Sequence, residues 1–257
     1  MVVANDGKIY FWIHLCYFII KKVRTAICFS GELRSVEKCI SGWEEKILPK
    51  IGEYDSFYFT WDDDPHINKL KYLDKLNLKD VLVSKRLTFH EKLYKLRQRP
   101  EVNVQGMLRQ LYCLKQSNII KSKYESKNNF RYDCVIRMRP DILVEPDAVF
   151  PEVSKLDLKK LHVFKHDAWF GYNDRVYFSN SSNMNILQER LDDLDNHFYS
   201  GGIIHYEIFF HNTARKNNIL AEKHDFRFKL LRANGSVSFC WENDPYWKNL
   251  WDNQSIY

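Results

Sequence analysis

The sequence predicts an α/β fold in which a mostly parallel central sheet is flanked by helices. Short runs rich in β-branched and aromatic residues alternate with longer segments of helical periodicity, as they do in βα units. Several of these runs end in charged residues, and open α/β sheets bind ligands at the carboxyl ends of their strands. The 257 residues are 45% hydrophobic and 15% aromatic, which is enough apolar surface for a substantial core.

The net charge of the chain is +6, from 39 basic and 33 acidic residues that are spread along the sequence. Such a modest and dispersed excess suits an anionic small ligand at least as well as nucleic acid.

The six cysteines are Cys16, Cys28, Cys39, Cys113, Cys134 and Cys240. They form no CxxC pair, and most of them lie inside apolar runs. This favours reduced, buried thiols over a disulfide framework or a cysteine zinc site, and therefore a reducing compartment. Three Asn-x-Ser matches, at Asn180, Asn234 and Asn253, are then expected to carry no glycan.

Residues 1–22 are expected to be an apolar extension ahead of one domain formed by residues 23–257, because the chain shows no internal repeat and no low-complexity linker. The apolar run at residues 9–20 has 12 residues, whereas a membrane-spanning helix needs about 20. We expect this run to pack on the domain as a strand or helix. Peripheral membrane contact or a signal anchor is the alternative.

Residues 24–30 (RTAICFS) are the first predicted strand, and Gly31 opens the turn that follows it. An amphipathic helix capped by Ser35 and ending near Pro49 is predicted next. Its apolar face is marked by Val36, Ile40, Trp43 and Ile47. Gly31 allows close backbone approach, while the helix N-terminus and Arg34 supply positive charge, so the turn is a candidate phosphate or diphosphate site. The alternative is a turn without a ligand.

A second strand, at residues 55–61, leads into three consecutive carboxylates that include Asp62 and Asp64. Divalent cations prefer oxygen ligands, and Asp62-x-Asp64 has the spacing that many sugar-nucleotide enzymes use. The alternative is a solvated acidic turn before Pro65. A third strand is predicted at residues 80–87 and a long helix at residues 104–124.

The segment of residues 132–144, YDCVIRMRPDILV, places cations and a carboxylate at the end of a buried strand. Its apolar core runs directly into Arg137, Arg139 and Asp141. Pro140 cannot donate a ladder hydrogen bond and biases Arg139 toward an extended conformation, so strand pairing is expected to stop here. Arg139 and Asp141 then face a ligand. The alternative is an ion pair that closes the strand.

The second half of the chain has predicted strands at residues 161–165, 175–179 and 226–231, and predicted helices at residues 184–194 and 204–216. Aromatic and acidic residues alternate in the loop after the first of these strands. Trp169 and Tyr172 are candidates to stack on a sugar, with Asp167 or Asp174 accepting hydrogen bonds from its hydroxyl groups. A loop that is simply packed is the alternative. The tail, residues 239–257, is expected to pack over the sheet edge.

No GxGxxG, Walker A, HExxH or GxSxG motif is present, which removes the commonest dinucleotide, P-loop, zincin and hydrolase interpretations. Over residues 24–232 the chain resembles small GT-A-type glycosyltransferases of bacterial surface-polysaccharide pathways and of large algal DNA viruses. The resemblance implies a GT-A-like, Rossmann-like domain that moves a sugar from a nucleotide-diphosphate donor to a hydroxyl of a glycan acceptor. It rests on the ordered set AICFSGELRS, YDSFYFTWDD, YDCVIRMRPDI, NDRVYFSNSSNM and HYEIFFHNTARKNNI.

In such enzymes a strand-end Asp-x-Asp binds a divalent cation, Mn²⁺ or Mg²⁺, which holds the donor diphosphate. Here Arg139-Pro140-Asp141 takes that place, so Asp141 is the matched metal ligand and Arg139 replaces the other aspartate. Arg139 can neutralise a diphosphate directly through forked hydrogen bonds, which leaves the metal requirement open. The implied donor is a UDP- or GDP-linked sugar, and its site comprises Gly31, Arg34, Arg137, Arg139 and Asp141.

The resemblance also implies that Asp174 and Glu207 face the acceptor. An inverting transfer needs a carboxylate there, because the acceptor hydroxyl must lose its proton as it attacks. Asp174 is the favoured base because it lies in a loop. Glu207 lies in an apolar helix, and the alternative interpretation of this residue is a structural carboxylate. Asp167, Trp169 and Tyr172 are the expected acceptor-binding residues. A cytoplasmic location is expected, in the host cytoplasm if the chain is viral, with membrane association as the alternative.

Two other classes stay open at the level of sequence. A basic nucleic-acid-binding domain or nuclease would use Asp62, Asp64 and Asp141 as metal ligands, but it predicts clustered cations and exposed aromatics, whereas the basic residues are dispersed and no nucleic-acid partner is expected. A catalytically inactive glycosyltransferase-like protein is the other class, because the Asp-x-Asp is incomplete.

Overall fold

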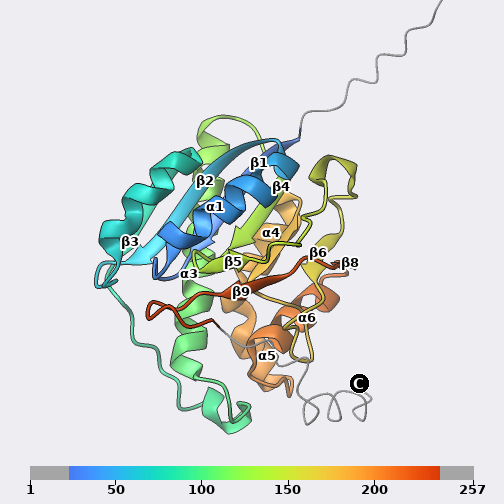
Figure 1. Cartoon of the computed structure of the whole chain (residues 1–257). Coiled ribbons are helices and arrows are strands. Elements are labelled where there is room, and N and C mark those ends of the chain that lie inside the picture. The colour runs from blue at the N-terminus through green and yellow to red at the C-terminus, as the bar shows by residue number, and fades with distance from the viewer. Residues whose placement is uncertain (1–22, 238–257) are drawn as a thin grey trace, which may run out of the picture.

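A seven-stranded sheet lies at the centre of the computed structural model, which describes residues 23–237 (Figure 1). The strand order is β3-β2-β1-β4-β7-β6-β8. All neighbours pair in parallel except β7, which runs antiparallel to β4 and β6. The expected α/β fold with a mostly parallel sheet is therefore confirmed. The strands are β1 (Arg24–Ser30), β2 (Glu53–Trp61), β3 (Leu78–Ser84), β4 (Cys134–Met138), β6 (Leu161–Phe164), β7 (Val176–Ser179) and β8 (Ala221–His224).

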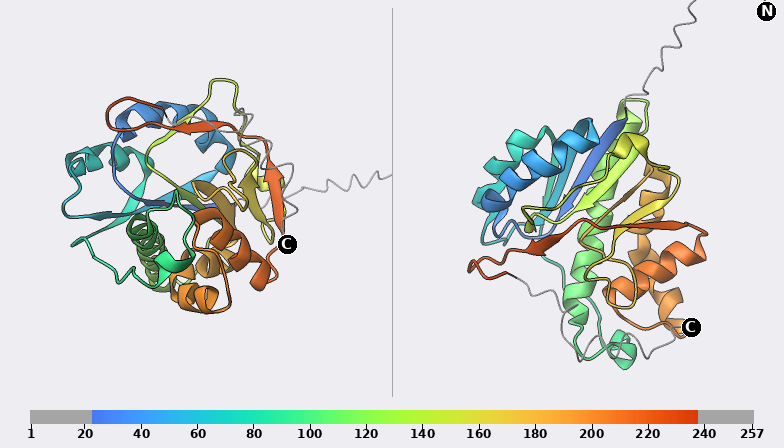
Figure 2. Two further views of the ribbon diagram at one scale, coloured as in Figure 1. Left: turned by 90° about the horizontal axis from the view of Figure 1, so that it is seen from below. Right: turned by 45° about the vertical axis from the view of Figure 1, so that its right-hand side comes forward.

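Helices cover both faces of this sheet, with α1 and α3 on opposite sides (Figure 2). Because side chains alternate along a strand, Ile27 and Phe29 of β1 pack toward α1, whereas Ala26 and Cys28 pack toward the side of α3. The helices α4 and α6 share the α3 side. The α-helices are α1 (Val36–Lys46), α2 (Leu48–Ile51), α3 (Val104–Lys127), α4 (Ser181–Gln188), α5 (Leu194–Tyr199) and α6 (Tyr206–Lys216), and the 3₁₀ helices are η1 (Ile67–Leu76), η2 (Tyr94–Arg97), η3 (Val153–Lys155) and η4 (Arg190–Asp193).

Trp43 anchors α1 to the rest of the fold. Its ring is fully buried and stacks on Phe29 with ring centroids 5.4 Å apart. Its indole Nε1 donates a 2.7 Å hydrogen bond to the carbonyl oxygen of Ile142. Ser35 precedes α1 as expected, but its hydroxyl donates to the carbonyl oxygen of Arg232 at 2.9 Å and makes no cap hydrogen bond. The start of α1 is thus joined to the last described segment of the chain.

Three local features differ from the sequence prediction. Strand pairing stops at Pro140, as expected, but the residues beyond it form a second sheet that was not predicted, in which β5 (Ile142–Val144) pairs with β9 (Phe228–Leu230). The predicted helix at residues 184–194 is divided into α4, η4 and the start of α5. Strand β8 was not predicted, since its sequence, AEKH, lacks the apolar alternation of a strand.

The four cysteines of the described region, Cys28, Cys39, Cys113 and Cys134, are free and buried, as expected. Burial raises the pKa of Cys28, Cys39 and Cys113 to about 12, so these thiols are unreactive in the native protein. Cys16, Cys240 and the predicted packing of residues 9–20 and 239–257 lie outside the described residues. Within residues 23–237 no helix is long and apolar enough to cross a membrane.

A buried polar network joins α3 to α4 and to the start of β4. The fully buried ammonium of Lys121 contacts Glu125 at 3.1 Å, Ser181 at 2.7 Å and Asn185 at 2.7 Å. The other oxygen of Glu125 accepts from the Tyr132 amide at 2.9 Å. Every group in the network has a partner, which is the condition for a buried charge pair to be tolerated.

We expect Lys121→Ala to lower the free energy of unfolding by about 3–5 kcal/mol, because it leaves the Glu125 carboxylate buried without its counter-charge. Urea denaturation followed by circular dichroism measures this loss. The matched control is Lys123→Ala, which removes an exposed lysine from the same helix. Equal losses in the two variants would show that the network contributes nothing to stability.

Candidate functional site

The strand order reverses between β1 and β4, which creates a crevice at the carboxyl ends of these two strands. From β1 the chain proceeds outward to β2 and β3, and then crosses to β4 on the other side. Ligands of open α/β sheets bind at such a switch point. A cavity of about 190 Å³ lies there. It is lined by Ser30, Gly31, Glu32, Arg34, Trp61, Arg86, Gly106, Arg109, Gln110, Cys113, Arg137, Arg139, Pro140 and Asp141.

All five residues that the sequence assigned to the donor site line this cavity. They are Gly31, Arg34, Arg137, Arg139 and Asp141. The whole lining contains five arginines and two carboxylates, an excess of three positive charges. A cavity of this composition favours an anion with several negative charges.

The β1–α1 loop is held in place by residues of β2 and the turn after it. Gly31 has φ +115°, a conformation that side chains rarely adopt, and its carbonyl oxygen accepts a 2.5 Å hydrogen bond from the Tyr58 hydroxyl. The buried Asp64 carboxylate accepts from the Leu33 amide at 3.0 Å and from the Thr60 hydroxyl at 3.0 Å. Asp64 therefore shapes the loop that carries Arg34.

The Asp141 carboxylate is 1% exposed and receives two guanidinium groups. Arg139 makes a forked pair with it, at 2.8 Å from Nε and 2.7 Å from Nη2, and Arg34 Nη1 lies 3.3 Å away. Burial opposes ionisation, but Arg139, Arg34 and then Arg232 hold the pKa of the Asp141 carboxyl below its usual value. The ion pair foreseen as the alternative for this strand end is thus present, and it lies on the wall of the cavity.

Arg137 is a buried cation whose charge is not matched by a carboxylate. It is 1% exposed, its Nη1 donates to the carbonyl oxygen of Arg175, and its Nε has no hydrogen-bond partner. Within residues 23–237 Arg137 forms no ion pair with Asp or Glu. Burial lowers its pKa to about 10, so the guanidinium stays charged at neutral pH. The charge of Asp174 offsets part of the cost of burial, and an anion in the cavity would offset more of it.

Asp174 and Glu207 lie close to each other, next to the switch-point cavity. Both are buried, and Gln110, which lines the cavity from α3, donates a hydrogen bond to Asp174 Oδ2. Burial and the Asp174 carboxylate raise the pKa of Glu207 well above its usual value. His205 Nδ1 lies 3.2 Å from Glu207 Oε2 but is not aligned as a hydrogen bond, and burial lowers its pKa. The structure therefore brings the sequence-predicted pair together, and Glu207 is the member whose pKa is raised.

The expected acceptor-binding residues Asp167, Trp169 and Tyr172 do not line the cavity. Asp167 is buried and forms an ion pair with Arg175. The Tyr172 ring packs on α6, 4.8 Å from the His211 ring and 5.9 Å from the Phe210 ring. Trp169 has positive φ, as does Asp167, so the loop folds back sharply. Their assignment to an acceptor stays a prediction.

Sequence reasoning missed the contribution of α3 and β3 to the site. Gly106, Arg109, Gln110 and Cys113 line the cavity at i, i+3, i+4 and i+7, so they form one face of α3. In the sequence, Arg109 and Gln110 lie beside the apolar face of the predicted helix, and this pattern could have predicted that the helix presents polar side chains to a ligand. Arg86 follows β3 and lies over the Trp61 ring, with its Cζ 5.9 Å from the ring centroid.

The acidic run after β2 does not form a metal centre in the described region. Asp62 is exposed, the Asp63 carboxylate pairs with Arg86 Nε at 2.8 Å, and Asp64 supports the loop. Among residues 23–237 one group of three metal-ligand side chains is close enough to hold an ion, and it comprises His162, Glu222 and His224 near the β8 edge.

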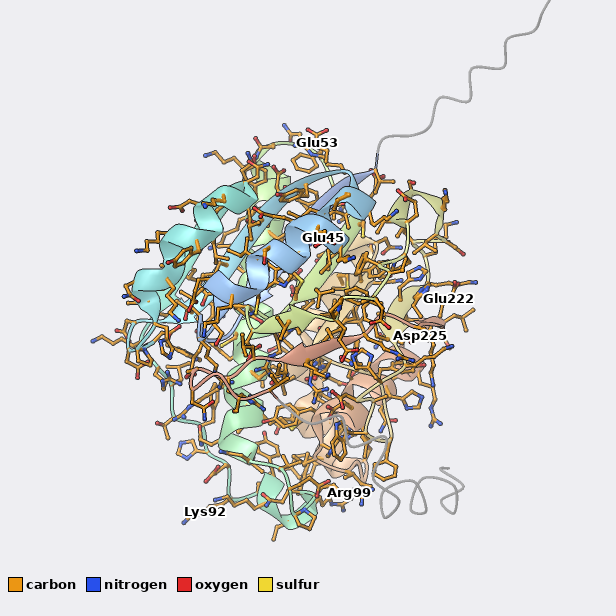
Figure 3. The ribbon with its side chains drawn as sticks, viewed as in Figure 1. Glu45, Glu53, Lys92, Arg99, Glu222 and Asp225 are labelled. Carbon is orange, nitrogen blue, oxygen red and sulfur yellow. The ribbon has the colours of Figure 1, made fainter. Side chains whose placement is uncertain are left out.

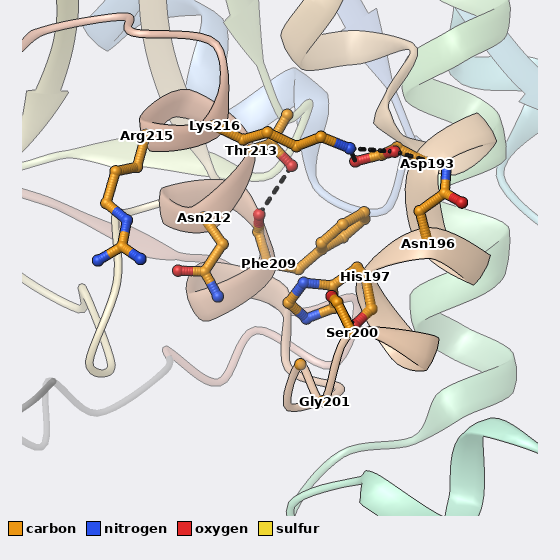
Figure 4. A pocket seen from close by; sticks show the side chains of 11 residues that line it. Asp193, Asn196, His197, Ser200, Gly201, Phe209, Asn212, Thr213, Arg215 and Lys216 are labelled. Carbon is orange, nitrogen blue, oxygen red and sulfur yellow. Dashed lines mark hydrogen bonds and ion pairs between the residues drawn. The ribbon is translucent and has the colours of Figure 1, made fainter.

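A second cavity, of about 830 Å³, lies between α5 and α6 (Figure 4). Lys216 crosses its rim to Asp193, with Nζ to Oδ1 and Oδ2 distances of 2.6 and 2.8 Å. His197 and Phe209 form part of its wall. None of the residues that the sequence assigned to a donor or an acceptor lines this cavity.

The fold and the site together define an α/β protein with an arginine-rich cavity at the switch point of its sheet. The chain belongs to the family described as Domain of unknown function (DUF7796), whose model matches residues 20–242. A comparison with curated proteins gave no significant match.

The raised pKa of Glu207 makes a pH-dependent contribution to stability. A carboxyl whose folded-state pKa lies above the unfolded value of about 4.5 stabilises the fold fully below that value, and this contribution is lost as pH rises through the folded-state pKa. Glu207→Gln cannot ionise. We therefore expect the stability of the wild type relative to Glu207→Gln to fall as pH rises above about 4.5, as measured by urea denaturation. A difference that does not change with pH would contradict a raised pKa for Glu207.

Proposed function

We propose that this protein is a glycosyltransferase that binds the diphosphate of a nucleotide sugar in the switch-point cavity and transfers the sugar to a hydroxyl group of a glycan. The observation that carries the proposal is the buried Arg137, whose charge lacks a carboxylate partner in the described region and which opens on a cavity already rich in arginine. A diphosphate supplies the missing negative charge, and its oxygens match the donors of several guanidinium groups.

The cavity volume is consistent with one part of such a donor. Ligand pockets for complete drug-sized molecules span about 300–1,000 Å³, whereas this cavity measures about 190 Å³. It suits the diphosphate and the adjoining atoms of the sugar. The nucleoside then lies outward along the carboxyl edge of the sheet.

A divalent cation does not fit at Asp141 in the arrangement described here. Both carboxylate oxygens accept hydrogen bonds from Arg139, and Arg34 lies beside them. A cation would have to displace a guanidinium whose own charge repels it. We therefore propose that Arg137, Arg139 and Arg34 neutralise the diphosphate in place of a metal ion, with Arg139 and Arg34 held in position by Asp141.

In an inverting transfer the acceptor oxygen forms a bond to the anomeric carbon while the bond from that carbon to the diphosphate oxygen breaks. The electron pair of the broken bond stays on the diphosphate, where the arginines stabilise the added charge. The proton of the acceptor hydroxyl passes to a carboxylate. Asp174 is the proposed base, because burial and the Asp174 charge raise the pKa of Glu207 and so favour the protonated form of that neighbour.

The nuclease alternative is less well supported. It requires Asp62, Asp64 and Asp141 around one metal ion, but Asp64 supports a backbone loop and Asp141 is held by Arg139. These three carboxylates do not form a metal-ligand group in the described region.

The deciding experiment measures thermal shifts with UDP, GDP, their sugar conjugates and short oligonucleotides, each with and without Mn²⁺. A ligand at 100 times its Kd adds about 2.7 kcal/mol of stability. We expect stabilisation by a nucleoside diphosphate or nucleotide sugar without Mn²⁺. Stabilisation by oligonucleotides alone would overturn the proposal, and a response that needs Mn²⁺ would overturn its metal-independent part.

Arg137→Met separates a ligand-binding role from a structural one. Methionine fills a similar volume without a buried charge, so the variant is expected to be as stable as the wild type or more stable, and to lose the stabilisation by the nucleoside diphosphate. The control is Arg227→Ala, whose exposed guanidinium lies 3.6 Å from Asp225 and away from the cavity. A less stable Arg137→Met protein that still responds to the nucleotide would assign Arg137 to structure.

Asp174→Asn is expected to reduce turnover by about 10²- to 10⁴-fold with little change in donor affinity, because it removes the base and leaves the cavity arginines in place. Steady-state kinetics with an identified donor and acceptor measure both quantities. Glu207→Gln is the matched comparison and should retain most turnover, since glutamine resembles the protonated carboxyl. If Glu207→Gln loses turnover and Asp174→Asn does not, the two roles are exchanged.

A further inference from the structure

The edge of the sheet at β8 carries a cluster of metal-ligating side chains outside the switch-point cavity. His162 of β6 is directly paired with Glu222 of the neighbouring β8, and His224 follows two residues later on β8. Because side chains alternate along a strand, Glu222 and His224 project from the same face as His162. Figure 3 shows Glu222 at this edge of the molecule.

The ligand atoms of these three residues all lie within 4.8 Å of one another. His162 Nδ1 and His224 Nε2 are 2.8 Å apart. In a tetrahedral zinc site with bonds of about 2.0–2.1 Å, neighbouring ligand atoms are separated by about 3.4 Å. The two imidazole nitrogens therefore need to separate by about half an ångström. His162 is fully buried, whereas His224 is partly exposed, so a shift of His224 can supply this separation.

The contacts of His162 on its far side are those of a metal ligand. Its Nε2 lies 3.0 Å from the Asp157 carbonyl oxygen, which can only accept a hydrogen bond. The Nε2 atom is then the protonated one, and the lone pair of Nδ1 is directed at the cluster. A ring N–H donated to a backbone carbonyl is the outer-shell arrangement that fixes the tautomer of metal-bound histidines.

From this geometry we propose that His162, Glu222 and His224 form a binding site for zinc or another first-row transition-metal ion. Two imidazole nitrogens and one carboxylate are a donor set of zinc sites that keep the fourth position for water. The ion joins edge strand β8 to β6, so its binding stabilises the sheet edge.

Two contacts have to be displaced. Because His162 Nδ1 carries the lone pair, His224 Nε2–H donates a 2.8 Å hydrogen bond to it, and the proton has to move to Nδ1 of His224 before Nε2 can bind a metal ion. The Lys160 ammonium lies 3.2 Å from Glu222 Oε2, and the side chains of the two residues are 41% and 40% exposed. Ion pairs between side chains this exposed are weak, because water screens both charges, so the Lys160–Glu222 pair does not prevent metal coordination. Removal of Lys160 should therefore tighten metal binding.

The test is an isothermal calorimetry experiment in which untagged, chelator-treated full-length protein is titrated with Zn²⁺. We expect one equivalent of tightly bound Zn²⁺ and a rise in the melting temperature. Glu222→Gln and His224→Gln should each weaken binding by at least about 10-fold, because each removes a ligand. Lys160→Met should strengthen it. The visible absorption of bound Co²⁺ should show tetrahedral coordination in the wild type and lose that signature in His224→Gln.

His211→Gln is the matched control, because this half-buried histidine lies on α6 and outside the cluster. Its Zn²⁺ affinity should equal that of the wild type. Both test variants alter partly exposed residues of β8, so we expect them to fold. His162 is not substituted, because it is fully buried and its loss would endanger folding. An absence of stoichiometric binding, or equal affinity in His224→Gln and His211→Gln, would overturn the proposal.

Discussion

The forked ion pair between Arg139 and Asp141 fixes the geometry on which the rest of the site depends. It forms directly after Pro140 ends β4, and its carboxylate also holds Arg34 from the loop after β1. The backbone of Asp141 takes part as well, because its carbonyl oxygen accepts from the Leu231 amide at 2.9 Å. Charge-assisted hydrogen bonds in a buried setting are strong and directional. One residue therefore fixes the end of β4, the β1–α1 loop and the segment after β9 relative to one another.

Beyond this pair the residues that line the cavity carry more positive than negative charge, with five arginines against two carboxylates. Arg137 is buried beside the cavity, and its hydrogen-bond acceptor is a backbone carbonyl oxygen. The pKa of Arg232 is lowered, mainly by burial and to a smaller extent by the positive charge of Arg139. Such repulsion opposes folding, and a fold retains it where a ligand relieves it. The electrostatics thus indicate a polyanionic ligand before any family resemblance is considered, and the resemblance adds the nucleotide sugar as the proposed identity of that ligand.

The carboxylates of the chain take different roles according to their surroundings. Asp64 accepts three hydrogen bonds, from Leu33, Thr60 and His66, and is a structural support. Asp174 and Glu207 are buried close together, where two negative charges are unfavourable, and burial and Asp174 raise the pKa of Glu207. The different roles that we propose for the two carboxyl groups rest on these surroundings, since either residue has the same chemistry in water.

The sequence by itself determined the parallel core of the sheet, the amphipathic α1 and the gathering of the five residues proposed for the donor site at one cavity. These features depend on local periodicity and on where a buried strand ends. Tertiary structure decided what depends on distant contacts. The acidic run became a support for the β1–α1 loop, and Tyr172 turned toward α6 because an apolar surface was available there. Strand β8, with no apolar pattern of its own, exists because β6 offers unpaired backbone groups at the sheet edge. Local pattern specifies burial and period, whereas the partner of each polar side chain is set by chain segments that meet only in the folded state.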